Sequence, residues 1–256
     1  MGLFDKLRRD GASQEAQPAY PAGKRVYAIG DIHGRCDLLE QLHETIDQDA
    51  AAFDGEKQVV YLGDFVDRGE ASRQVIDHLL SDPLPDFESI YLMGNHEHAA
   101  LSFYDNPHSI PGWLSWGGRE TLYSYGIQTG FSAGQDDLER LRTLWEGAMP
   151  AIHLKFLESC QVCHHEGDYY FVHAGIRPGV SLQKQVFEDQ LWIREPFLSS
   201  TKNHGAVVVH GHTISEEVVQ MPNRIGLDTG AFKTGVLSCL VLEGTDQRLL
   251  QTGGVM

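Results

Sequence analysis

Three apolar runs in the first hundred residues alternate with amphipathic stretches, and this alternation predicts a parallel β-sheet. The runs Val26 to Gly30, Val59 to Gly63 and Ile90 to Gly94 are typical of buried strands. Between them, apolar residues recur at helical spacing: Leu38, Leu39, Leu42 and Ile46, then Val75, Ile76, Leu79 and Leu80. Each strand–helix–strand unit takes ~30 residues, as a βαβ crossover requires. Ligands of such a sheet bind outside the carboxyl ends of its strands.

The rest of the chain changes character twice. Residues 97 to 159 are predicted to be mostly helical, and whether they form a substrate lid stays open. Beyond them the runs Tyr169 to Val172, Ala206 to Val209 and Val236 to Leu242 predict a more antiparallel half. No fixed-period repeat or internal linker interrupts this pattern. We therefore expect one catalytic domain over residues 25–256, preceded by a flexible tail over residues 1–24 that is rich in Ala, Gln, Pro and Gly.

A glycine followed by a polar residue ends each of the first three runs. Asp31 and His33 follow the first run, Asp64 the second and Asn95 the third. In extended backbone Asp31 and His33 would point the same way, so both could hold one ion. Asp64 can bridge two ions with its two oxygens. These residue types at neighbouring strand ends indicate a metal site.

Two histidines at later strand ends extend the candidate ligand set. His173 and His212 add two imidazoles to the amide oxygen of Asn95 and the carboxylates. This mixture suits Mn²⁺, Fe or Zn²⁺ better than Mg²⁺ or a thiolate-bound structural zinc. Six ligands with one shared carboxylate indicate two metals ~3.5–4 Å apart, the arrangement that promotes phosphoryl and phosphodiester hydrolysis.

The chain resembles the calcineurin-like metallophosphoesterases, and more narrowly their serine/threonine phosphoprotein phosphatase branch with its bacterial and phage lambda members. Five blocks carry the resemblance, in order: Gly30-Asp31-Ile32-His33-Gly34, Gly63-Asp64-Phe65-Val66-Asp67-Arg68-Gly69, Gly94-Asn95-His96-Glu97, His173-Ala174-Gly175 and Gly211-His212-Thr213. Ile214 stands where many relatives outside this branch carry another metal histidine, which favours this branch. The resemblance implies an α/β sandwich of two mixed β-sheets flanked by helices.

The resemblance also implies a role for each matched residue. The first metal would be held by Asp31, His33 and Asp64, and the second by Asp64, Asn95, His173 and His212. His96 would be the general acid, oriented by Asp67, while Arg68 and Arg194 would bind phosphate. A hydroxide bridging the two divalent metal ions would be the nucleophile; Mn²⁺ is the expected metal, with Fe and Zn²⁺ as alternatives.

These roles predict a two-metal phosphomonoesterase that acts on phosphoserine or phosphothreonine in proteins. The alternative is a symmetrical dinucleoside tetraphosphate hydrolase, whose members resemble this chain but commonly lack an acid at position 67. A third hypothesis is a metal-binding scaffold without turnover, which the intact ligands, acid and arginines disfavour. Both enzymes would take small or protein-borne phosphoesters as partners; the oligomeric state stays open.

Composition narrows the partners further. The 256 residues carry a formal net charge of −16, which disfavours a nucleic-acid partner because phosphate contacts need clustered Lys and Arg. No run approaches the ~18 apolar residues that span a bilayer, and Met1 to Lys6 lacks the apolar core of a signal peptide. The sequence therefore predicts a cytoplasmic protein with no membrane partner.

Two remaining patterns are interpreted as structural. The run Cys160 to His164 matches a c-type haem attachment pattern, but we interpret it as a helix end followed by a strand start. Trp113 and Trp116, beside Gly117 and Gly118, are interpreted as packing under a loop and not as a substrate platform. His98, His164 and His165 are interpreted as surface residues.

Overall fold

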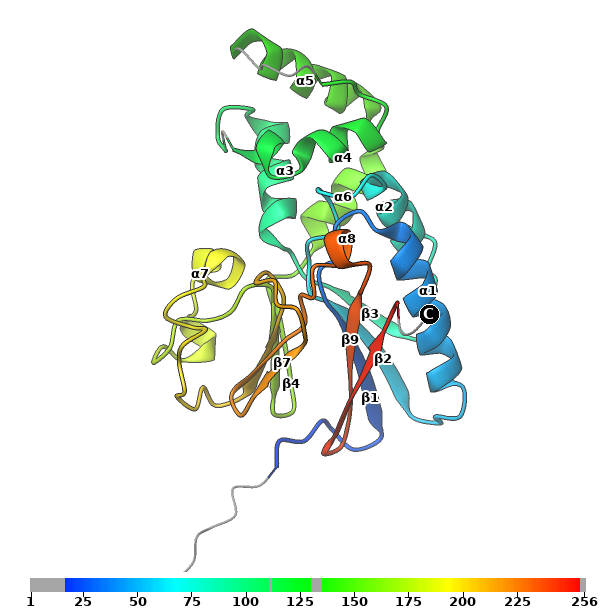
Figure 1. The fold of residues 1–256 in the computed structure, drawn as a ribbon, viewed down its shortest axis with the longest axis vertical. Helices are drawn as coiled ribbons and strands as arrows, with labels where there is room; N and C mark the ends of the chain where they lie inside the picture. Colours follow the sequence, from blue (N-terminus) through cyan, green and yellow to red (C-terminus); the bar gives the residue numbers. More distant parts are fainter. Residues whose placement is uncertain (1–16, 111, 130–134, 254–256) are drawn as a thin grey trace, which may run out of the picture.

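The computed structural model describes residues 17–110, 112–129 and 135–253. Its first sheet contains β1 (Lys24–Ile29), β2 (Glu56–Tyr61), β3 (Glu88–Tyr91), β9 (Ser238–Glu243) and β10 (Asp246–Gln251). Its second contains β4 (Cys163–Glu166), β5 (Tyr169–Val172), β6 (Val207–His210), β7 (Val219–Met221) and β8 (Arg224–Gly226). The strand orders are β10-β9-β1-β2-β3 and β4-β5-β6-β8-β7. Both sheets mix parallel and antiparallel pairs, so the predicted α/β sandwich is confirmed (Figure 1).

Strand alternation explains why the two sheets pack together. In β1, Val26 and Ala28 face the second sheet, where they meet Phe171 and Val209 in one apolar cluster. The intervening residue Tyr27 belongs to the opposite cluster, beneath the helices. Since successive side chains of a strand point to opposite faces, a run that is apolar at every position can fill two cores at once.

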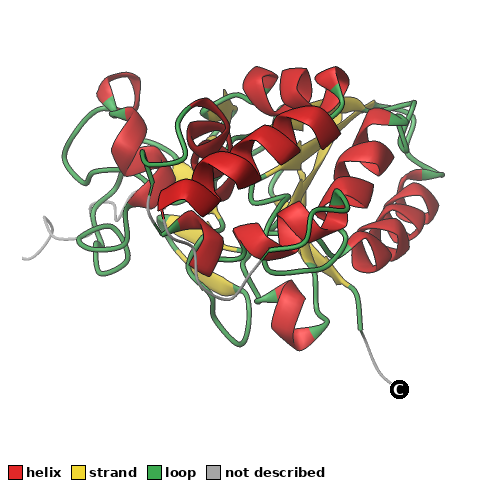
Figure 2. Ribbon diagram, turned by 90° about the horizontal axis from the view of Figure 1, so that it is seen from above, coloured by secondary structure: helices red, strands yellow, loops and turns green. Residues whose placement is uncertain are grey.

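The outer face of the first sheet is covered by α1 (Cys36–Ala50) and α2 (Ser72–Leu80), the two predicted crossover helices. Above them lie α3 (Asn95–Asp105), α4 (Gly118–Ser124), α5 (Gln135–Ala148) and α6 (Ala151–Ser159), which confirms that residues 97 to 159 are mostly helical. A 3-10 turn, η1 (Trp113–Ser115), precedes α4. Viewed from above, these helices and their loops lie in front of much of both sheets (Figure 2).

Two further helices and a second 3-10 turn, η2 (Leu182–Lys184), belong to the C-terminal half. The helix α7 (Phe187–Trp192) lies at one end of the second sheet, and α8 (Ala231–Thr234) lies above β9 of the first sheet, below the upper helices (Figure 1). The segment after α6 enters β4 at Cys163, so the haem-like pattern spans a helix end and a strand start, as interpreted from the sequence.

The segment just before β1 packs onto the sandwich. Tyr20 is only 2% exposed, and its hydroxyl contacts Gln58 and Glu166 on the two sheets. This contact lies within the predicted tail of residues 1–24, so packed structure begins before the predicted boundary. Residues 1–16 of that tail lie outside the described residues. No helix in the described ranges is both long and apolar enough to cross a membrane.

Candidate active site

The predicted metal ligands and His96 converge at the ends of β1, β2, β3, β5 and β6, and the backbone there is unusual. His33, Asp64 and His212 have φ angles of 46°, 52° and 64°, and Asp67 and Arg68 have 72° and 69°. Left-handed backbone at non-glycine residues costs ~1–3 kcal/mol each and persists only where the surroundings impose it. The prediction that Asp31 and His33 share an extended backbone is therefore wrong, because β1 ends at Ile29 and the chain turns.

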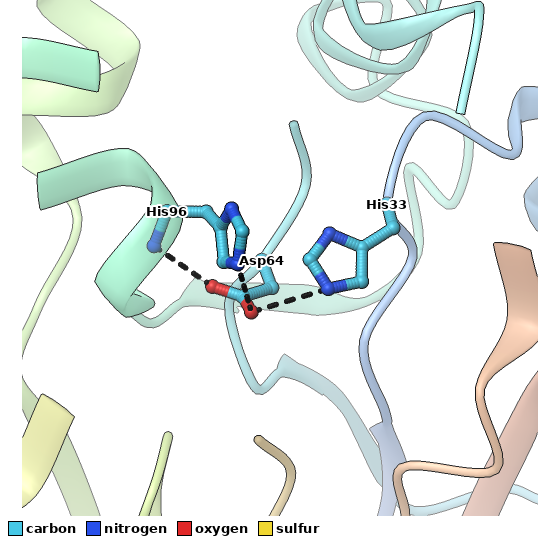
Figure 3. Close-up of side chains that lie close together, drawn as sticks. All are labelled: His33, Asp64 and His96. Atoms are coloured by element: carbon cyan, nitrogen blue, oxygen red, sulfur yellow. Dashed lines mark hydrogen bonds and ion pairs between the residues drawn. The ribbon is translucent and has the colours of Figure 1, made fainter. Parts of the chain in front are cut away.

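Asp64 occupies the centre of the site, and its two oxygens face different imidazoles. Its Oδ2 lies 3.3 Å from His33 Nε2 and 3.9 Å from His96 Nε2 (Figure 3). Its Oδ1 lies 3.4 Å from His173 Nε2. A carboxylate whose two oxygens point into two ligand clusters has the geometry of a bridge between two cations. This supports the bridging role that the sequence predicts for Asp64.

Asn95, His173 and His212 come together on the Oδ1 side of Asp64. The Asn95 side-chain oxygen lies 2.9 Å from His173 Nε2 and 2.8 Å from His212 Nδ1. His173 is fixed by its other ring nitrogen, which lies 2.8 Å from the Leu62 carbonyl at the end of β2. Two triads, His33–Asp64–His96 and Asp64–His173–His212, each place ligand atoms within 4.8 Å of one another.

Asp31 reaches the same centre from β1. Its carboxylate accepts the backbone N–H of His212 at 3.0 Å, which ties the first strand of one sheet to the last motif of the other. Asp228, after β8, is its buried neighbour. Burial and the charges of Asp228 and Asp64 raise the pKa of Asp31 well above its usual range. Three buried carboxyl groups this close need a cation to remain ionised together.

The histidines suit a metal because burial keeps them neutral. Burial lowers the pKa of His33 to about 3 and that of His212 to about 2, and it also lowers the pKa of His173. Among the described residues, His33 Nε2 and His212 Nε2 are buried and make no hydrogen bond. A buried imidazole nitrogen with a free lone pair has the chemistry of a metal ligand. The residues present therefore fit two divalent cations.

His96 differs from these histidines because a carboxylate holds its ring. Its Nδ1 donates to Asp67 Oδ2 at 2.6 Å, and its Nε2 points toward Asp64. Burial alone would lower the pKa of His96, but the charge of Asp64 and the hydrogen bond to Asp67 raise it. The predicted Asp67–His96 pair is thus assembled; Asp64 and Asp67 favour the imidazolium form of His96, and the Arg68 guanidinium opposes it.

Asp67 is itself held by two residues of the helical region. Trp113 Nε1 donates to Asp67 Oδ2 at 2.9 Å, and the Thr121 hydroxyl donates to Oδ1 at 2.6 Å. Trp113 is fully buried and stacks on Trp145. Trp113 packs in the core as the sequence interpretation expected, but its indole N–H also holds Asp67 of the Asp67–His96 pair. Sequence reasoning missed this second role and that of Thr121.

The two predicted phosphate-binding arginines lie at the rim of the site. Arg68 Nη2 donates to His96 Nε2 at 3.2 Å, and its guanidinium carbon lies 4.9 Å from the ring centroid of Phe232. Arg194 Nη2 donates to the His212 carbonyl at 3.4 Å. Gly117, at φ 122°, lies so close to Arg68 that an added Cβ would overlap its backbone nitrogen. The helical region therefore supports Arg68 as well as Asp67.

Glu97 is a site residue to which the sequence analysis assigned no role. It is completely buried, and it accepts the backbone N–H groups of Asp64, Phe65, Val66 and Gly94 at 2.7–3.2 Å. These four donors come from two strand ends, so one carboxylate fixes both turns that carry metal ligands. The only sequence signal for a role of Glu97 was its position inside the block Gly94-Asn95-His96-Glu97.

Four other histidines lie away from the centre: His210, two residues before His212, and the three interpreted from the sequence as surface residues, His98, His164 and His165. His210 turns away from the centre; its Nδ1 contacts the Gly211 carbonyl and its ring packs on Phe197. His165 is exposed, as interpreted, whereas His98 and His164 are partly buried. His98 packs against Phe187 of α7.

This fold and this site define a metal-dependent phosphoesterase. Residues 24–231 match the family model of the calcineurin-like phosphoesterases, and the chain belongs to that family. The match spans all five motif blocks, β1 to β3 of the first sheet and the whole second sheet, so the family resemblance seen in the sequence is confirmed. Membership of the serine/threonine phosphatase branch is a finer statement that this match does not decide.

Two curated relatives hydrolyse dinucleoside tetraphosphates by name. The asymmetrical bis(5'-nucleosyl)-tetraphosphatase of Anoxybacillus flavithermus is 25% identical over 83% of this chain and 88% of its own length. The symmetrical bis(5'-nucleosyl)-tetraphosphatase of Aromatoleum aromaticum is 28% identical over 60% of this chain and 45% of its own length.

Solved structures share the fold across several named activities. A protein assigned as a diadenosine tetraphosphatase superposes with a TM-score of 0.61 at 20% identity, covering 91% of this chain and 96% of its own. A cold-active protein tyrosine phosphatase gives 0.57 at 19% identity, covering 90% and 81%. A protein serine/threonine phosphatase from Saccharomyces cerevisiae gives 0.52 at 13% identity, covering 91% and 81%. These likenesses establish the fold alone.

Proposed function

We propose that this protein is a two-metal phosphomonoesterase whose substrates are phosphoserine and phosphothreonine residues of proteins. The observation that carries the proposal is the Asp67–His96 hydrogen bond of 2.6 Å, with Asp67 held in turn by Trp113 and Thr121. Asp31, His33 and Asp64 would hold one cation, and Asp64, Asn95, His173 and His212 the other. Mn²⁺ is the proposed metal and the cytoplasm the proposed compartment, as the sequence predicts.

The charged groups of the site would have two roles, phosphate binding and proton transfer. When bound, the cations would lower the pKa of water and offset the charge of the phosphoryl group. Arg68, which contacts His96, and Arg194, which contacts the His212 carbonyl, would bind phosphate oxygens. Arg68 now donates to His96 Nε2, so a phosphate that attracts the guanidinium would free this nitrogen to carry a proton.

The leaving group explains why the Asp67–His96 pair favours a phosphomonoester. A serine alkoxide is strongly basic and needs a proton in the transition state, whereas a nucleotide phosphate leaves without one. A buried carboxylate beside an imidazole keeps a proton available near neutral pH. The indole and the hydroxyl satisfy this buried carboxylate and also fix its position against His96.

The second candidate function is dinucleoside tetraphosphate hydrolysis, which the names of the two curated relatives favour. The first of these relatives matches most of both chains. Dinucleoside tetraphosphate hydrolysis would use the same two cations, but the bond cleaved would be a phosphoanhydride. Its phosphate leaving group has little need of a proton from His96.

A substrate panel separates the two candidates. Protein loaded with Mn²⁺ is assayed on peptides carrying phosphoserine, phosphothreonine or phosphotyrosine, on an aryl phosphate and on diadenosine tetraphosphate. The proposal predicts the higher kcat/KM for phosphoserine and phosphothreonine peptides. The variant Asp64→Asn, purified in the same way, controls for contaminating phosphatases. A kcat/KM for diadenosine tetraphosphate well above that of every phosphopeptide would establish the second candidate instead.

A further inference from the structure

Two tryptophans form an open aromatic pair at the rim of the site. Trp116 follows η1, and Trp192 is the last residue of α7. Their ring centroids lie 5.7 Å apart and their planes are inclined at 68°, an edge-to-face contact between segments 76 residues apart in the chain (192 − 116). Trp116 remains 40% exposed, although tryptophan is usually highly buried. The interpretation of Trp116 as packing under a loop is therefore incomplete, because much of its surface is open.

Each tryptophan is joined by a short stretch of chain to one phosphate-binding arginine. Trp116 directly precedes Gly117, whose carbonyl accepts the backbone N–H of Arg68 at 3.4 Å. Trp192 stands two residues before Arg194, which donates to the carbonyl of the candidate ligand His212. The aromatic pair is thus linked through the chain to both arginines of the rim. A ligand with phosphate at the metals and a ring farther out would meet both features.

The Trp116 side chain is held in place by neighbouring residues. The Trp116 indole lies against the backbone of Gly112, where an added Cβ would come within 2.6 Å of its Cε2 and Cζ2 atoms. Gly112 thus lets the indole approach the backbone closely, and Trp192 packs edge-to-face against it. An indole that is packed on one side and exposed on another suits base stacking, because its side chain loses little conformational freedom when a base binds.

We propose that Trp116 and Trp192 form a subsite for the nucleobase of a nucleotide substrate whose phosphates bind Arg68, Arg194 and the metal centre. The inference rests on the second function proposed above, because it supplies the base-recognition element that dinucleoside polyphosphate hydrolysis would need. The position of the tryptophan pair at the rim, away from the metal centre, favours a nucleobase over the ring of phosphotyrosine. In phosphotyrosine the ring is bonded directly to the phosphate oxygen and would lie at the metals, whereas a ribose separates base from phosphate and carries the base to the rim.

Binding of two non-hydrolysable probes to the Mn²⁺-loaded protein tests the subsite without using turnover. The probes are α,β-methylene-ADP and methylenediphosphonate, which share the diphosphonate but differ by the nucleoside, and calorimetry gives each Kd. Base–indole stacking predicts that the nucleotide binds about 5-fold to 150-fold more tightly. Trp116→Ala and Trp192→Ala should each remove most of this preference and leave the Kd of methylenediphosphonate unchanged. Trp116→Phe should keep part of it.

The control is Tyr123→Ala, which removes another exposed aromatic side chain of the same helical region and should keep the full preference. A preference that is absent in the wild type, or that survives in both alanine variants, overturns the subsite. So does a loss of binding of non-hydrolysable phenylphosphonate, used as a third probe, with no loss of nucleotide binding. If the preference depends on the tryptophans but diadenosine tetraphosphate is not hydrolysed, the subsite stands and the second proposed function fails.

Discussion

The substitution Asp67→Asn isolates the proton-donor pair from the rest of the site. Asp67 accepts three hydrogen bonds, from Trp113 and His96 at Oδ2 and from Thr121 at Oδ1. An asparagine can keep its oxygen toward the tryptophan and histidine and turn its amide toward Thr121, whose hydroxyl can also accept. The geometry should persist while the charge is lost.

The size of the effect follows from the bond that is weakened. A hydrogen bond to a charged partner contributes about 1.5–3 kcal/mol, so kcat for an alkyl phosphate should fall about 10-fold to 150-fold. The loss should shrink for 4-nitrophenyl phosphate, because nitrophenolate leaves with little protonation. Asp82→Asn is the matched control, since Asp82 is exposed, lies outside the site and also has a positive φ angle of 56°. Equal losses on alkyl and aryl phosphates would refute an acid role for the pair.

Three further variants test other parts of the account. His96→Asn should lower kcat by ~10²–10⁴ with metal content unchanged by elemental analysis; loss of metal would show that His96 is a ligand and not the acid. Glu97→Gln should destabilise the fold by about 1–3 kcal/mol in denaturant unfolding, because the amide offers one acceptor oxygen to four backbone donors; unchanged stability would contradict its bracing role. Asp49→Asn should destabilise the protein near pH 7. Burial would raise the pKa of Asp49, but its hydrogen bonds with Arg248 and Tyr27 outweigh this and lower it. The ionised carboxylate therefore stabilises the fold above its unfolded pKa, and this stabilisation is lost as pH falls through the folded pKa. A stability difference that grew toward acid pH would contradict this sign.

The side chains that converge at the proposed metal site were predictable because their chemistry and their position coincide. Each proposed ligand has a residue type that binds cations, and most follow an apolar run where a parallel strand ends. Asp228 offers the same signal, since it follows the run Ile225 to Leu227, yet no motif block covered it. Its position beside Asp31 emerged only from the fold.

The supporting residues were not predictable from local pattern. Trp113 and Thr121 are 46 and 54 residues away from Asp67 in the chain, and neither has a metal-binding side chain. Only the packing of the helical region onto the β2 end brings them together. The left-handed backbone at His33 and Asp64 was missed for a related reason: it is imposed by tertiary contacts and contradicts the ordinary preference of both residues.

Metal stoichiometry tests the central claim most directly, because the account depends on Asp64 bridging two cations. Wild-type protein and Asp64→Asn are loaded with Mn²⁺, passed through a desalting column and analysed for metal per chain. The account predicts two equivalents for the wild type and less than one for the variant, with activity abolished. One equivalent in the wild type, or two in an Asp64→Asn protein that turns over normally, would contradict it.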